Sequence, residues 1–183
     1  MRILGISGSL RRDSHNTRLL HGVGRLLPEG VELELFDQLA AIPPFNQDEE
    51  HETPPAVAAL KAAIAGADAV LVATPEYNAS IPGVLKNALD WVSRPVEDRP
   101  MVGKPTAVIG ASISLFGAVW AQAEARKVLG TMGARVVDRE LPLPDAEEAL
   151  GDDGLPRDAG ARELLDATLT ELIESAEPER VPA

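Results

Sequence analysis

Three segments of the chain are almost entirely apolar, and a fourth alternates between apolar and charged residues. The apolar segments are 2–7, 67–74 and 105–112. A strand buried on both faces needs such a continuous apolar run, as in the middle of a parallel sheet. In segment 31–36, Glu32 and Glu34 alternate with apolar residues, which predicts a strand with one face in water at the edge of the sheet. A short run at 135–137 is the candidate for the opposite edge.

Helical patterns lie between these strands, because apolar residues recur there three and four positions apart. The stripes are Leu19, Leu20, Val23, Leu26 and Leu27; Ile81, Val84, Leu85, Ala88, Leu89 and Val92; Ala121, Ala125, Val128, Leu129 and Met132; and Leu165, Leu169, Leu172 and Ile173, with a weaker helix at 55–66. Strands that alternate with helices predict right-handed crossovers and a parallel sheet covered on both faces. We therefore predict an α/β fold, a flavodoxin-like three-layer sandwich with a five-stranded parallel sheet of order 2-1-3-4-5. Its ligand cleft lies beyond the carboxyl ends of the first and third strands.

The length of 183 residues suits one domain. We expect a single domain over residues 1–176 and a polar tail over 177–183. The connection 37–54 is long for a compact domain, which predicts a lid or a partner surface. Its charged run from Glu49 to Glu52 is interpreted as solvated charge and not as a metal site.

Composition excludes several classes of function. The chain has 29 acidic and 17 basic residues, a net charge of −12, which argues against general binding to nucleic acid or to an anionic membrane. It has no cysteine, so disulfides, thiolate metal sites and cysteine nucleophiles are excluded. The sequence shows no transmembrane run, and its start, MRILGISGS, lacks the features of a secretory signal. We therefore expect a cytoplasmic protein.

The stretch GISGSLRRDSHNTRLL, residues 5–20, joins the first strand to the first helix. Backbone N–H groups at a helix N-terminus favour a phosphate there. The side chains that can donate hydrogen bonds are Ser9, Arg11, Arg12, Ser14, Asn16 and Thr17. The stretch contains neither GxxxxGK[ST] nor GxGxxG. It predicts a phosphate site, and an ordinary capped helix start with solvated arginines is the alternative. We expect His15, beside the phosphate loop, to be an exposed residue of the first helical turn; the alternative is that it faces the ligand.

A second loop, within TPEYNASIPGVLKNALDW, follows the third strand on the other side of the same cleft. It contains the only tyrosine, Tyr77, between two prolines that stiffen the turn. Pro82 suits the first turn of the next helix, with Ser80 as its cap. Asn78 and the loop amides suit the polar edge of a ring. A planar ring attached to a phosphate, as in FMN, fits such a pair of loops; the alternative for Tyr77 is a packed, half-buried aromatic residue.

These residues carry a family resemblance. The segments GSLRRDSHN, PPFNQD, ADAVLVATPEYNASIPGVLKNALDW, GKPTAVIGAS and FGAVWAQ resemble the NADPH-dependent FMN reductase family, which includes azo, quinone and chromate reductases. The similarity covers residues 2 to 140. The resemblance implies that the FMN phosphate is bound by Ser9, Arg11, Ser14, Asn16 and Thr17. It implies that the isoalloxazine ring lies against Pro75, Glu76, Tyr77 and Asn78, with Ala111 and Ser112 closing its other side.

The resemblance also implies an activity. Hydride passes from NADPH or NADH through bound FMN to a small-molecule acceptor, which is a quinone, an azo compound, free flavin or a metal oxyanion, with ping-pong kinetics and no obligatory catalytic side chain. The family forms homodimers or homotetramers with the flavin near the interface, where Trp120 is a candidate contact. Trp120 at the mouth of the cleft, or packed on a neighbouring loop, is the alternative. A one-electron carrier and a flavin-free phosphate-binding module are the rival functions.

Overall fold

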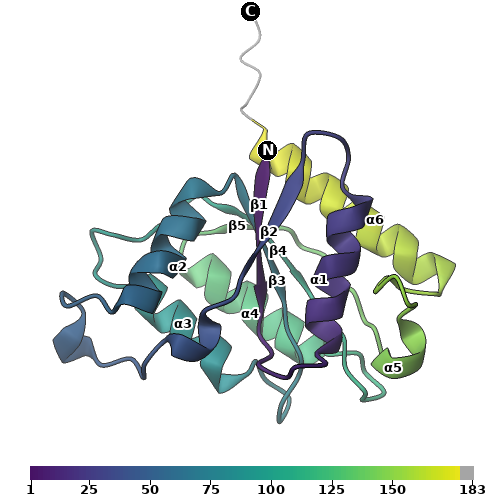
Figure 1. Ribbon diagram of the computed structural model, residues 1–183, viewed down its shortest axis with the longest axis horizontal. Helices are drawn as coiled ribbons and strands as arrows, with labels where there is room; N and C mark the ends of the chain where they lie inside the picture. The colour runs from purple at the N-terminus through teal and green to yellow at the C-terminus, as the bar shows by residue number, and fades with distance from the viewer. Residues whose placement is uncertain (178–183) are drawn as a thin grey trace, which may run out of the picture.

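Five parallel strands form one sheet in the order β2-β1-β3-β4-β5, as the sequence predicts (Figure 1). The computed structural model describes residues 1–177, so the predicted polar tail lies outside the described residues from position 178 onward. The strands are β1 (Arg2–Ser7), β2 (Glu32–Phe36), β3 (Ala69–Ala73), β4 (Pro105–Ile109) and β5 (Arg135–Val136). The flavodoxin-like sandwich is thereby confirmed.

Helices cover both faces of the sheet (Figure 1). On one face α1 (His15–Leu26) and α6 (Ala159–Ala176) pack in a core that contains Leu19 and Leu165. On the other face α2 (Pro55–Gly66), α3 (Gly83–Val92) and α4 (Val119–Thr131) share a second core. A short helix, α5 (Ala146–Ala149), precedes α6. No helix within residues 1–177 has the length and apolar character needed to cross a bilayer.

Burial along the strands follows the pattern of the sequence. All residues of β3 and β4 are buried, as expected for strands inside a parallel sheet. In β2, Glu32 and Glu34 are exposed, whereas Leu33 and Leu35 are partly buried against α1. Four strands are shorter than predicted: β2 and β5 by one residue each, and β3 and β4 by three each, because the apolar runs at 67–74 and 105–112 extend beyond the residues that pair in the ladder.

The connection 37–54 packs on α3 at its middle. It contains two short 3₁₀ turns, Leu39–Ala41 and Gln47–Glu49. The Pro43 carbonyl accepts hydrogen bonds of 2.8 Å from the indole N–H of Trp91 and from the Asn87 amide. Phe45 meets the Trp91 ring edge to face, with centroids 5.1 Å apart. The middle of the connection is therefore fixed to α3 and does not form a free lid.

Candidate functional site

Three loops meet at the carboxyl ends of β1, β3 and β4 and line a pocket of about 240 Å³. The lining residues are Ser9, Arg11, Ser14, His15, Asn16, Pro75, Glu76, Tyr77, Ala111, Ser112, Ile113 and Ser114. All the predicted site residues except Thr17 and Asn78 are among them. The fold therefore gathers residues from segments about a hundred positions apart, because strand ends of a parallel sheet lie at one edge.

The first loop ends in a capped helix. Ser14 is the N-cap of α1, and its buried hydroxyl accepts a 3.2 Å hydrogen bond from the Thr17 N–H. Arg11 is exposed, and its guanidinium forms no ion pair or hydrogen bond within the described residues. Thr17 shares a 2.8 Å hydrogen bond with Ser7 and faces an adjoining groove of about 440 Å³, which also contains Arg11 and Asp37. Arg11 therefore lines both the pocket and the adjoining groove.

Asn16 connects the first loop to the third. Its amide donates to the Ala111 carbonyl and its side-chain oxygen accepts from the Ala111 N–H, both at 2.9 Å. The sequence predicts a free amide donor at this position. In the structure the amide is engaged with the protein backbone, because Asn16 is buried against the end of β4.

The second loop is a tight two-residue turn. Tyr77 and Ser80 exchange backbone hydrogen bonds of 3.0 and 3.1 Å, and the residues between them, Asn78 and Ala79, have φ of 53° and 58°. Left-handed backbone at both central residues is the hairpin geometry that favours Asn followed by Gly. The Tyr77 side chain is 48% exposed and lines the pocket.

The sequence predicts that Ser80 caps the next helix, but in the structure it does not. α3 begins at Gly83, with Pro82 at the N-cap and no side-chain capping bond. Ser80 is engaged in the turn, and its hydroxyl donates a 2.5 Å hydrogen bond to the Glu124 carboxylate of α4. The prediction was wrong because the turn, and not the helix, determines the backbone at Ser80.

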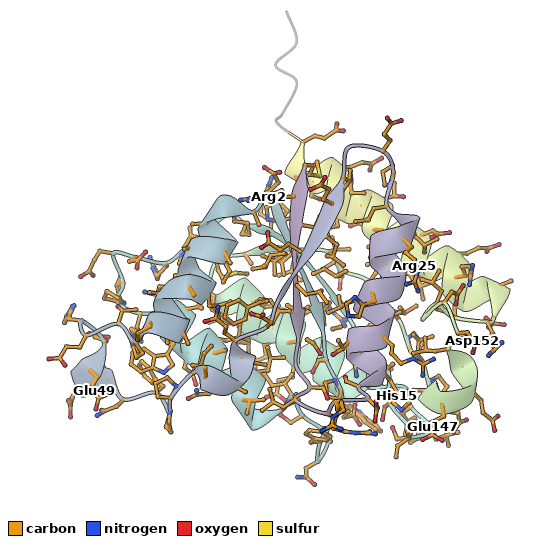
Figure 2. The ribbon with its side chains drawn as sticks, in the orientation of Figure 1. Arg2, His15, Arg25, Glu49, Glu147 and Asp152 are labelled. Carbon is orange, nitrogen blue, oxygen red and sulfur yellow. The ribbon has the colours of Figure 1, made fainter. Side chains whose placement is uncertain are left out.

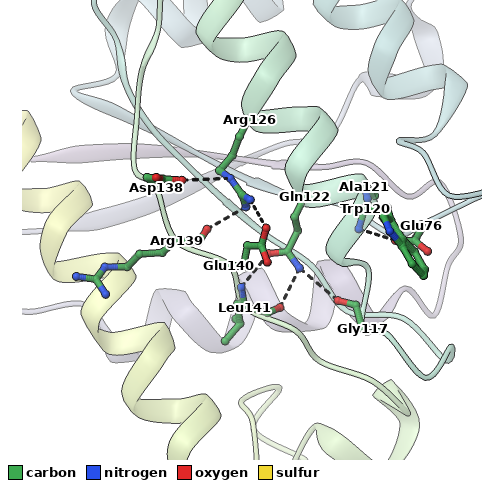
Figure 3. Close-up of polar contacts among 10 residues, drawn as sticks. All are labelled: Glu76, Gly117, Trp120, Ala121, Gln122, Arg126, Asp138, Arg139, Glu140 and Leu141. Atoms are coloured by element: carbon green, nitrogen blue, oxygen red, sulfur yellow. Dashed lines mark hydrogen bonds and ion pairs between the residues drawn. The ribbon is translucent and has the colours of Figure 1, made fainter.

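Glu76 and Gln122 fix the start of α4 beside the pocket (Figure 3). One Glu76 oxygen accepts from the N–H groups of Trp120 and Ala121, at 3.1 and 3.2 Å. The fully buried Gln122 exchanges two 2.9 Å hydrogen bonds with the Leu141 backbone, and it donates a third to the Gly117 carbonyl. Both side chains therefore hydrogen-bond to backbone groups next to the third loop, at the start of α4 and at Gly117 and Leu141.

The third loop exposes apolar side chains at the mouth of the pocket. Ile113, Leu115 and Phe116 are 66, 74 and 52% exposed. Trp120, 47% exposed, contacts Phe116 with ring centroids 4.8 Å apart. Trp120 is thus packed on a residue of the neighbouring loop. Exposed apolar clusters are typical of interaction surfaces.

His15 differs from its prediction as an exposed residue. It is partly buried, both ring nitrogens are inaccessible to solvent, and neither has a hydrogen-bond partner within residues 1–177. Burial, followed by the positive charges of Arg11 and Arg18, lowers the pKa of the imidazole, and Glu147 opposes that shift. The helical pattern gives no signal for this burial.

Comparisons with known proteins agree with this geometry. The model of the NADPH-dependent FMN reductase family matches residues 1–148. The chain belongs to this family. An NAD(P)H-dependent FMN reductase of Pseudomonas aeruginosa is 42% identical over 174 residues, which cover 94% of this chain and 93% of the relative. A quinone reductase of Escherichia coli is 35% identical over 141 residues, 76% of this chain and 74% of that protein.

A solved structure extends the agreement to the whole fold. The flavoenzyme NAD(P)H:(acceptor) oxidoreductase FerB of Paracoccus denitrificans has a TM-score of 0.82 and 34% identity, over 95% of this chain and 98% of FerB. The cofactors of the family are FMN and NAD(P)H. The residues present fit FMN. Among residues 1–177, the lining of the pocket combines serine hydroxyls, an unpaired guanidinium, a helix N-terminus and an exposed tyrosine.

Proposed function

We propose that this member of the FMN reductase family uses NADPH or NADH to reduce a small-molecule acceptor, with quinones as the principal class. The observation that carries the proposal is the pocket at the ends of β1, β3 and β4, with phosphate-type donors on one side and Tyr77 on the other. Relatives named as quinone reductases and as a 2-hydroxy-1,4-benzoquinone reductase support the acceptor class. Azo compounds, free flavin and metal oxyanions are the other acceptors to assay.

We assign the phosphate side of the pocket to the first loop. Ser9, Ser14 and the N–H groups at the start of α1 suit hydrogen bonding to phosphate oxygens, and Arg11 adds a charged, bidentate donor. Asn16 contributes by fixing Ala111, and Thr17 by its bond to Ser7.

We assign the ring side to the other two loops. Pro75, Glu76 and Tyr77 form one wall, and Ala111 and Ser112 form the other. Asn78, in the turn directly after Tyr77, is assigned to the polar edge of the ring. Bound FMN supplies two-electron transfer chemistry, which needs no acid or base from the protein. The protein's part is to bind and orient, so we name no catalytic side chain. The fixed backbone of the loops keeps the ring wall in place while donor and acceptor use the same mouth in turn.

We also propose that the chain functions as one domain over residues 1–176 and assembles into a homodimer or homotetramer in the cytoplasm, where its nicotinamide donor is available. The cluster Ile113, Leu115, Phe116 and Trp120 supports assembly, because exposed apolar surface of this kind is stabilised by burial. Light scattering of wild type and of Leu115→Ser measures the mass. A wild-type monomer at micromolar concentration would contradict the assembly.

The rival function is a one-electron carrier with the same fold. A flavodoxin of Pseudomonas aeruginosa matches at a TM-score of 0.58 and 20% identity, which concerns the fold alone. The reductase proposal is favoured because the full-length relatives with more than 30% identity carry the names of NAD(P)H-dependent enzymes.

The test is an anaerobic visible spectrum of the FMN-loaded protein, recorded before and after NADPH or NADH is added. The proposal expects rapid bleaching of the flavin bands and recovery of those bands when a quinone follows. Free FMN at the same concentration is the control for direct reduction. Bands that persist with both nucleotides would favour the carrier, and protein that retains no flavin would favour a phosphate-binding module.

A further inference from the structure

His15 is an imidazole whose hydrogen-bonding capacity is not used by the part of the chain that the structure describes. Both nitrogens are buried, and within residues 1–177 neither has a partner. A neutral imidazole has one N–H donor and one acceptor, and a protonated imidazole has two donors. A buried donor without a partner costs about 1–3 kcal/mol, so a buried ring of this kind needs a partner that is not part of the described chain.

The position of His15 indicates where that partner lies. It is the first residue of α1, directly after the N-cap Ser14 (Figure 2). Its side chain lines the same pocket as Ser9 and Arg11. Both nitrogens are covered in this structure, so the imidazole must turn about its side-chain bonds to present one of them to the pocket. It would then be a third kind of donor beside a helix N-terminus and a guanidinium, and all three favour an anion.

Charged groups surround His15 on three elements. Arg11 belongs to the loop after β1, Arg18 lies one turn further along α1, and Glu147 belongs to α5. Burial and the two arginines disfavour the protonated ring, which lowers the pKa of His15, and Glu147 offsets part of that effect. An anion bound beside Arg11 and the helix N-terminus reverses this balance, because it neutralises the arginine charge and favours the imidazolium.

We propose that His15 is a ligand of the FMN phosphate and that its imidazole takes up a proton when FMN binds. The inference rests on the proposed phosphate side of the pocket. It assigns to His15 a role that makes FMN affinity depend on pH. The imidazole has a higher pKa in the FMN complex than in the FMN-free protein, where its pKa is lowered from 6.5. FMN affinity therefore rises as the pH falls from the pKa of the complex to the pKa of the FMN-free protein.

The experiment measures dissociation constants by quenching of flavin fluorescence. Wild type, His15→Phe and His15→Gln are titrated with FMN at about pH 6 and about pH 8, and with riboflavin, which lacks the phosphate. The phosphate of FMN itself takes up a proton near pH 6. The dissociation constant of each variant is therefore divided by that of wild type at the same pH, which removes the effect of the phosphate. His21→Gln is the matched control, because His21 is an exposed residue of the same helix.

The expected result is a loss of FMN affinity for His15→Phe of roughly tenfold or more at the lower pH and of about threefold at the higher pH. His15→Gln keeps a neutral donor, so it should resemble wild type only at the higher pH. Riboflavin binding and His21→Gln should be unaffected. Equal FMN constants for wild type and His15→Phe at both pH values, or equal losses with riboflavin, would overturn the proposal.

A measurement on the native protein covers the case in which the variants fold poorly. The chain has three histidines, so NMR signals of ¹⁵N-labelled imidazoles are few. The pKa of one of them should rise when FMN is added and should remain unchanged with riboflavin. No change in any histidine would overturn the role of His15 while leaving the reductase function intact. Wild type that binds no FMN would overturn both.

Discussion

Asn16 and Ala111 bind each other through two hydrogen bonds of 2.9 Å, one in each direction, although 95 positions separate them in the chain. The pair joins the start of α1 to the loop after β4. Both partners are buried, so the hydrogen bonds are protected from water. The Asn16 side chain therefore links the two loops that border the pocket directly.

Replacement of Asn16 by alanine tests this dependence. Asn16→Ala leaves the buried N–H and C=O of Ala111 without partners, and we expect the free energy of unfolding to fall by about 2–3 kcal/mol. Urea denaturation measures the change. Gln38→Ala, at an exposed position without a side-chain capping bond, should change it by less than about 0.5 kcal/mol. A similarly small change for Asn16→Ala would show that the loops are fixed by other contacts.

Glu76 should stabilise α4 through its charge. Its carboxylate accepts from the first-turn N–H groups of Trp120 and Ala121, where a negative charge interacts favourably with the helix dipole. Glu76→Gln keeps an acceptor but loses the charge, so we expect a loss of about 0.5–1 kcal/mol that shrinks in high salt. Urea denaturation with and without added sodium chloride measures both effects. A loss that is independent of salt would assign the effect to geometry and not to charge.

Ala79 is strained by the tight turn. Its φ of 58° lies in the left-handed region, which costs an L-residue about 1–2 kcal/mol, while glycine adopts it freely. Because glycine also gains entropy in the unfolded chain, we expect Ala79→Gly to raise the free energy of unfolding by about 0.5–1 kcal/mol. The matched control is Ala62→Gly in α2, which should lower it by about 1 kcal/mol. Two losses of equal size would mean that the turn is unstrained.

The lowered pKa of His15 predicts how the stability of the FMN-free protein depends on pH. The unfolded chain binds a proton near pH 6.5, whereas the folded state resists it until a lower pH. The stabilising contribution is therefore present above about pH 6.5 and is lost as the pH falls through the folded-state value. Urea denaturation of wild type and His15→Phe at about pH 7.5 and pH 5.5 measures it. Wild type should lose more stability than the variant between these values, and parallel losses would contradict the assignment.

Arg11 should contribute to cofactor affinity more than its neighbour does. A charge-assisted hydrogen bond contributes about 1.5–3 kcal/mol, so we expect Arg11→Ala to weaken FMN binding roughly 10- to 150-fold. Arg12 is exposed in the same loop but does not line the pocket, and Arg12→Ala is the matched control. Fluorescence titration measures both. An unchanged FMN dissociation constant for Arg11→Ala would refute its role as the principal phosphate ligand.

The sequence predicts the fold well because the inner strands β3 and β4 are buried on both faces and therefore appear as continuous apolar runs. Continuous apolar runs and helical stripes are local patterns, and they indicate the order of the sheet correctly. The short α5 helix, Ala146–Ala149, was not predicted, since four residues are too few for a stripe. Trp91 is buried beside the apolar stripe of α3.

The site is predicted less completely. Residue types in the loops identify most of the residues that line the pocket, whereas their individual partners depend on contacts between distant segments. The amide of Asn16 is occupied by Ala111, and the ring of His15 is buried near α5. The apolar Ile113 and the hydroxyl of Ser114 line the pocket through a loop whose conformation no local pattern specifies.

The loop after β4 is held at both ends by groups that it does not itself supply. Ser112 bonds through its backbone to Leu143 at 3.0 Å and to Ala146 at 3.1 Å, and Gly117 accepts from Gln122 at 3.3 Å. The side chains of residues 113–116 are exposed between these fixed points. Ile113 and Ser114 also line the pocket, whereas Leu115 and Phe116 do not, so the side chains at 115 and 116 can change without replacing any residue that lines the cofactor pocket.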